Sequence, residues 1–138
     1  MGLENGFLVK SNKRKITRDM LPSIIKYPFE DDYNDAPEII YFRKCWGVRT
    51  QLIWCLTPKT EKLASPSTYY AYTSVDVMDV IKCLSSFMDE FVWDEEANSI
   101  WTYEEIAPHL LQDIVNLAAI AVYMDENPDV YLEFYDSY

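Results

Sequence analysis

Along residues 102–135, TYEEIAPHLLQDIVNLAAIAVYMDENPDVYLEFY, the spacing of the apolar residues changes from that of a helix to that of a strand. The first part predicts an amphipathic helix, because its apolar residues recur three or four positions apart: Ile106, Leu110, Ile114, Leu117, Ala121 and Met124. Asn127-Pro128 ends that helix. Residues 129–135 then alternate apolar and polar side chains, as a half-buried strand does. A long helix followed by a strand favours an α+β fold.

The residues before this stretch predict another helix. Ser74 is a good N-cap residue, and Asp76 lies in the first turn, where the helix dipole favours a negative charge. The apolar stripe that follows is Val77, Ile81, Leu84, Met88 and Phe91. The later helix is expected to begin near Thr102, in a capping box with Glu105, and to be kinked by Pro108.

Strands are predicted mainly in the first half of the chain. Residues 38–45 and 48–56 are rich in β-branched and aromatic side chains, and Trp46-Gly47 between them suits a tight turn. One face of the second strand is expected to meet the core, and Trp54 to be buried there. The residues of that face are Val48, Thr50, Leu52, Trp54 and Leu56.

Shorter elements complete the predicted architecture. Residues 7–17 suit a small hairpin and residues 69–73 a short strand, while Pro22 and Pro28 limit residues 18–26 to a short helix. An acidic loop is expected at residues 29–37, and a polar surface loop at residues 57–68. The sequence therefore predicts one domain over residues 1–138, with a small antiparallel sheet and two long helices packed on one face.

The composition is typical of a folded domain of this size. The 138 residues are 49% hydrophobic and 25% charged. The longest uninterrupted apolar run, residues 117–124, is shorter than the roughly 20 residues of a membrane-spanning helix. Three cysteines without close pairing suit reduced thiols. We therefore expect a cytoplasmic protein with no membrane segment.

The net charge of −11 is unevenly distributed. Residues 1–63, the β-rich half, contain 11 Lys and Arg against 8 Asp and Glu, a charge of +3. Residues 64–138, the mainly helical half, contain 1 against 15, a charge of −14. Such a field repels nucleic acid and anionic membranes and attracts basic protein surfaces.

Aromatic side chains next to carboxylates give the leading functional hypothesis. Two segments combine them most densely: Trp93, Asp94, Glu95 and Glu96, and then Tyr131, Glu133 and Tyr135. Rings of this kind supply contact area at interfaces, and carboxylates around them steer a basic partner. The hypothesis is a non-catalytic protein-binding module of the inhibitor, immunity or adaptor type. The competing interpretation is that most of these rings fill the core.

Nucleic-acid contact is the alternative function. Arg43, Lys44, Trp46 and Arg49 would place three cations and an indole at the tip of the predicted hairpin, where they could hold a phosphate backbone and stack on a base. The whole-chain charge opposes this. The competing interpretation is that these cations protect an edge strand or pair with the acidic half.

A small enzyme is the third hypothesis. Glu105, His109 and Asp113 lie four residues apart on one helical face, so they could bind a metal or orient the imidazole as a general base. The favoured interpretation is that His109 is a partly exposed surface residue beside its i, i+4 partners, and that the protein is not an enzyme.

No cofactor is expected. The three glycines do not form a phosphate-binding pattern, and the cysteines and the histidine are too scattered for structural zinc. A monomer and a homodimer are equally compatible with the exposed aromatic residues.

Overall fold

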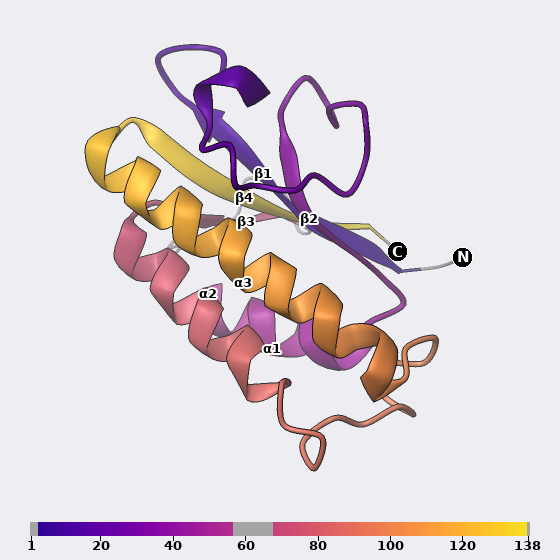
Figure 1. Ribbon diagram of the computed structural model, residues 1–138. Helices are drawn as coiled ribbons and strands as arrows, with labels where there is room; N and C mark the ends of the chain where they lie inside the picture. Colours follow the sequence, from indigo (N-terminus) through magenta and orange to yellow (C-terminus); the bar gives the residue numbers. More distant parts are fainter. Residues whose placement is uncertain (1–2, 57–67, 138) are drawn as a thin grey trace.

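The computed structural model describes residues 3–56 and 68–137 (Figure 1). The predicted loop at residues 57–68 lies outside the described residues, except for Thr68. The regular elements of the described part, in chain order, are β1 Glu4–Ser11, the short 3-10 helix η1 Arg18–Met20, β2 Glu38–Arg43, α1 Trp46–Leu56, β3 Thr68–Ala71, α2 Ser74–Ser86, α3 Tyr103–Glu126 and β4 Val130–Ser137.

The strands form one antiparallel sheet in the order β2-β1-β4-β3. Strands from the two halves of the chain are therefore neighbours, because β1 pairs with both β2 and β4. The three helices lie together on one face of this sheet (Figure 1). The predicted α+β class with a small antiparallel sheet is confirmed, and one more helix packs on the sheet than the sequence suggested.

The alternation predicted for the last strand sorts its side chains between the two faces of the sheet. Val130, Leu132 and Phe134 are buried in the core, whereas Tyr131 and Tyr135 are only partly buried. Successive side chains of a strand point to opposite faces, so the two tyrosines lie on the face away from the helices. This outer face carries the candidate site described below.

Both predicted helices form, each with an N-cap threonine. In α2 the cap is Thr73 rather than Ser74, and a capping box links it to Asp76. In α3 the side chain of Thr102 accepts a hydrogen bond from the backbone N–H of Glu105, and the helix continues through Pro108. The buried faces of α2 and α3 contain most residues of the predicted apolar stripes. Phe91 is the exception, because α2 ends at Ser86 and the Phe91 side chain is 99% exposed.

The largest error of the sequence-based prediction is the strand at residues 48–56, which is the helix α1. Val48, Leu52 and Leu56 are buried at helical spacing, and Trp54, predicted to lie in the core, is 78% exposed. The chain turns at Lys44, which has a φ of 54°, and not at Gly47. The first turn of this helix is bonded to a distant residue, because the buried Asn98 side chain accepts a hydrogen bond from the backbone N–H of Val48.

Two smaller predictions for the first half are also wrong. The chain does not form a hairpin at residues 7–17, because β1 is a single strand of eight residues and the predicted second arm lies outside any strand. The short helix predicted at residues 18–26 is reduced to the single turn Arg18–Met20. Residues 29–37 do form the expected loop, with one isolated bridge between Tyr33 and Ala36.

By length and composition α3 is long and apolar enough to cross a membrane. Core helices of soluble proteins have the same properties, and α3 places eight residues in the buried core, including Asp113 and Asn116. The Asn116 side chain bonds to the backbone of Lys26 and Ile39, which ties α3 to the loop before β2 and to β2 itself. The absence of a membrane segment stays a prediction.

Candidate functional site

The first predicted binding segment lies in the loop between α2 and α3 and is partly structural. Trp93 is only 8% exposed, and its indole N–H donates to the carbonyl of Trp101. The Asp94 carboxylate accepts hydrogen bonds from the backbone N–H groups of Glu96 and Ala97, which closes the turn. The side chains of this segment that are exposed and lack a structural bond of this kind belong to Glu95 and Glu96.

The second predicted segment, on β4, has its carboxylates largely compensated. Glu133 forms an ion pair with Lys10 at 2.8 Å, and Asp136, which is buried, accepts two hydrogen bonds from Arg49 Nε and one from its Nη2. Both cations belong to the first half of the chain. The carboxylates of this strand therefore do not extend an acidic exterior, and the acidic half is not electronegative over its whole surface.

The basic segment of the nucleic-acid hypothesis does not form a hairpin tip. Arg43 ends β2, Lys44 forms the turn, and Trp46 and Arg49 lie in the first turns of α1. The guanidinium of Arg49 lies 5.4 Å from the centre of the Trp46 ring and is bonded to Asp136. Nucleic-acid contact remains a prediction, but three cations and an indole do not converge on one tip.

The predicted Glu105, His109 and Asp113 group is reduced to a pair. His109 Nδ1 lies 2.7 Å from Asp113 Oδ2, whereas Glu105 is exposed at the helix start, where its carboxylate accepts a hydrogen bond from the Thr102 hydroxyl. Among the described residues no set of three His, Cys, Asp or Glu side chains is placed to hold a metal ion. The imidazole packs between the rings of Phe42 and Trp101, at centroid distances of 5.1 and 5.2 Å.

Burial and the contact between the two groups act on both members of this pair. Burial raises the pKa of Asp113, and the hydrogen bond and charge of His109 oppose that shift. Burial lowers the pKa of His109, but the hydrogen bond and the charge of Asp113 more than offset this and leave that pKa above its usual value. The thiols of Cys45 and Cys83 are poor candidates for a nucleophile, because burial raises the pKa of each to about 12.

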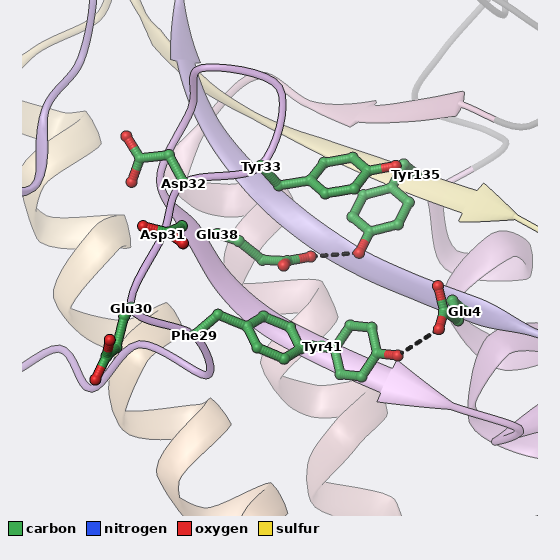
Figure 2. A pocket seen from close by; sticks show the side chains of 9 residues that line it. All are labelled: Glu4, Phe29, Glu30, Asp31, Asp32, Tyr33, Glu38, Tyr41 and Tyr135. Atoms are coloured by element: carbon green, nitrogen blue, oxygen red, sulfur yellow. Dashed lines mark hydrogen bonds between the residues drawn. The ribbon is translucent and has the colours of Figure 1, made fainter.

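A concave site lies on the outer face of the sheet, and we call this site the trough (Figure 2). Its volume is about 650 Å³, and its lining combines five carboxylates with four aromatic rings: Glu4, Phe29, Glu30, Asp31, Asp32, Tyr33, Glu38, Tyr41 and Tyr135. Eight of these nine residues belong to the first half of the chain. No Lys or Arg is among the described lining residues.

Two ring pairs form the walls of the trough. Tyr33 stacks on Tyr135 with centroids 4.6 Å apart, and Phe29 meets Tyr41 edge-on at 4.8 Å. Figure 2 shows the carboxylate of Glu38 between the two pairs. Tyr41 also donates its hydroxyl to Glu4 Oε1 at 2.8 Å. Of the four rings, Tyr41 and Tyr135 thus have their hydroxyls bonded to carboxylates.

Gly6 makes this arrangement possible. The sheet register places it between Tyr41 on β2 and Tyr135 on β4. The Tyr135 hydroxyl donates to Glu38 across this position. A Cβ atom on residue 6 would lie 2.5 Å from Glu38 Oε2 and 2.3 Å from the carbonyl oxygen of Ile40, so a larger residue would push the floor of the trough apart.

Glu38 has an unusual environment for a carboxylate. It is 2% exposed, and burial raises its pKa to about 7, although the hydrogen bond from Tyr135 opposes that shift. Burial and the Glu38 carboxylate raise the pKa of Tyr135 in turn. A cation above this floor would favour the charged form of Glu38.

The loop that supplies Phe29 to Tyr33 is held at both ends. Before it, Asn116 bonds to the backbone of Lys26, and after it the backbone N–H of Val9 donates to the carbonyl of Pro37 at 2.9 Å. Inside the loop, Asp32 accepts a hydrogen bond from Arg18 Nε at 2.8 Å. Glu30 and Asp31 remain as exposed carboxylates at the rim.

No family model, curated protein or solved structure matches this chain. The site is therefore interpreted from its own side chains. Sequence reasoning recognised residues 29–37 as an acidic loop and Tyr135 as a candidate contact, but it assigned the first half of the chain a basic character. The signal that could have found the trough is local, namely four carboxylates and two rings within residues 29–35.

Proposed function

We propose that the protein is a non-catalytic, cytoplasmic binding module that receives lysine or arginine side chains of a basic partner in the trough. The observation that carries this proposal is the meeting of five carboxylates and four rings in one open cavity. A cationic side chain is attracted by ring faces and carboxylates together, and its aliphatic stem packs on the rings.

The electrostatics of the rim support a cation rather than a neutral ligand. Arg18 compensates Asp32, but Glu4, Glu30 and Asp31 line the trough without an ion pair to Lys or Arg among the described residues. A neutral ligand would have to displace water from these carboxylates without replacing the hydrogen bonds, which is unfavourable. A cation restores the lost interaction.

The proposal keeps the basic partner expected from the sequence but changes where it docks. Glu95 and Glu96 form a second exposed acidic site, but the only aromatic residue of that segment, Trp93, is buried and bonded to Trp101. The trough offers rings and carboxylates together, so it is the better site for specific contact.

A charge-reversal pair tests this location. The binding of an unstructured Lys/Arg peptide is measured by calorimetry for the wild-type protein, for Glu30→Lys with Asp31→Lys, and for Glu95→Lys with Glu96→Lys. The two double variants change the net charge equally, and all four side chains are exposed. We expect the first variant to lose at least tenfold in affinity and the second to lose much less.

Two other results would each contradict a binding site in the trough. Equal losses in the two variants would mean that only the overall charge attracts the peptide. A loss confined to the Glu95 and Glu96 variant would place the binding site in the loop between α2 and α3. Either result would end the assignment to the trough.

A further inference from the structure

The outward face of α3 carries an apolar stripe that the sheet and the other helices leave largely exposed, with Val115 at its centre partly buried. Its members, spaced alternately three and four residues apart, are Pro108, Leu111, Val115, Ala118 and Val122. Leu111 is 56% and Val122 60% exposed. Spacing of this kind places the side chains along one seam, as at the a and d positions of a coiled coil.

The stretch of α3 that carries the stripe contains few charged residues. Between Glu105 and Asp125 the sequence of α3 contains one Asp or Glu and no Lys or Arg. That residue is Asp113, which is buried and bonded to His109. In a chain of net charge −11, this face of α3 lets a second copy approach without desolvating carboxylates of that helix.

We propose that the protein self-associates through this stripe, with α3 packed antiparallel against α3 of a second copy around a two-fold axis at Val115. The sizes of the side chains favour this orientation. It places Leu111 opposite the small Ala118 of the second copy, and Pro108 opposite Val122. A parallel arrangement would instead place Ala118 opposite itself and leave a gap in the middle of the seam.

The neighbouring helix α2 widens the contact. It runs antiparallel to α3, because the Ser74 hydroxyl bonds to Asp125 at one end and the Tyr103 hydroxyl bonds to the carbonyl of Met88 at the other. Val75 and Met78 of α2 are 62% and 50% exposed. They add apolar surface beside the stripe.

The area indicates a weak dimer. From Pro108 to Val122 the stripe spans about 21 Å, and two adjacent helices are together about 20 Å wide, so the two copies bury about 800 Å² in total. This is less than the roughly 1,200 Å² of stable interfaces. The expected dimer is therefore concentration-dependent.

Salt should strengthen this association. The antiparallel arrangement brings Glu104 of one copy near Glu126 of the other, and both copies are strongly negative. Screening reduces this repulsion. Binding at the trough has the opposite dependence, because salt weakens the attraction between the peptide and the carboxylates. The two surfaces can therefore be tested independently.

Sedimentation equilibrium over a range of protein concentrations tests the proposal. We expect the mass to rise from 16.2 kDa toward twice that value, and the dissociation constant to fall several-fold when salt is raised. Leu111→Glu should weaken association at least tenfold. Phe91→Glu is the matched control, since it adds the same charge on a side chain that is 99% exposed outside the stripe, and it should have little effect.

Orientation is tested by oxidative cross-linking. Val115→Cys should form a disulfide-linked dimer, whereas Val122→Cys and the wild-type chain, with its own three cysteines, should not. A monomer at every concentration, an unaffected Leu111→Glu variant, or cross-linking through Val122→Cys would overturn the proposal. Binding of the monomer to phosphatidylcholine vesicles that Leu111→Glu abolishes would also overturn it, because a membrane would then cover the stripe.

Discussion

The outer face of the sheet and the outward face of α3 both expose large side chains, but only the first surrounds them with carboxylates. In the trough, rings and five acidic groups meet. Along the α3 stripe, 19 residues of helix carry one carboxylate, and it points inward. The difference shows that the net charge of the chain does not predict the local composition of either surface. We infer that the trough selects a cation and the stripe selects a second apolar surface.

Gly6→Ala is expected to have the largest effect on stability and binding, and it should disrupt the trough without changing the α3 stripe. The new Cβ would lie 2.3 Å from the Ile40 carbonyl oxygen and would separate Glu38 from Tyr135. Overpacking and the lost hydrogen bond together cost about 3 kcal/mol of unfolding free energy. Urea denaturation measures this loss, and calorimetry should show peptide binding reduced at least tenfold. A variant as stable as the wild type would contradict the role given to Gly6.

Glu38 should make the stability depend on pH. Its pKa is raised from 4.5 to about 7 in the folded protein, so the folded state holds the proton more tightly than the unfolded state. The wild type should therefore lose stability as the pH rises from 4.5 through 7, by about 3 kcal/mol relative to Glu38→Gln. Parallel pH profiles of the two proteins would show that Glu38 titrates normally.

Asn5 lies next to Gly6 on β1 but faces the helices. A substitution at Asn5 therefore tests the core face of the sheet without changing the trough. Both polar atoms of its buried side chain lack a hydrogen-bond partner among the described residues. Asn5→Val should raise the unfolding free energy by about 1 kcal/mol and leave peptide binding unchanged. The matched control is Asn116→Val, which removes bonds to Lys26 and Ile39 and should lower stability by about 2 kcal/mol. Destabilisation by both substitutions would mean that Asn5 has a partner.

Tyr33→Ala should have the smallest effect and should act on binding alone. The ring is 40% exposed and stacks on Tyr135, so its loss costs little stability but removes one wall of the trough. We expect peptide affinity to fall by about 1 kcal/mol, roughly fivefold. Tyr72→Ala is the control, because Tyr72 is 48% exposed and lies in a different ring cluster with Tyr70 and Tyr131. Equal losses would mean that the peptide uses the whole tyrosine-rich face.

The sequence predicted the elements whose signals are local. The helix α2 follows from its apolar stripe, although its N-cap was predicted at Ser74 and lies at Thr73. The helix α3 follows from its stripe and from Thr102, and β4 follows from its alternation. The helix α1 was missed because its first turn is capped by Asn98, which lies 50 residues away. Its three buried residues, Val48, Leu52 and Leu56, fit a helical period as well as a strand period.

The acidic loop of the trough has a local signal in the sequence, but the assembled site could not be predicted, for a similar reason. It depends on the register that places Gly6 between Tyr41 and Tyr135, and on the loop that returns Tyr33 to the sheet. Charge counted along the chain also misled, because Lys10, Arg14 and Arg49 compensate carboxylates of the second half. Five of the eight acidic residues of the first half line the trough.

The most direct test of the central claim is a backbone NMR titration of the wild-type protein with the Lys/Arg peptide. Binding in the trough predicts chemical-shift changes that concentrate at Gly6, Tyr33, Glu38 and Tyr135 and that disappear in the Glu30→Lys, Asp31→Lys variant. Changes centred on residues 94–96, or no change at low salt, would contradict the claim that the trough receives a cationic side chain.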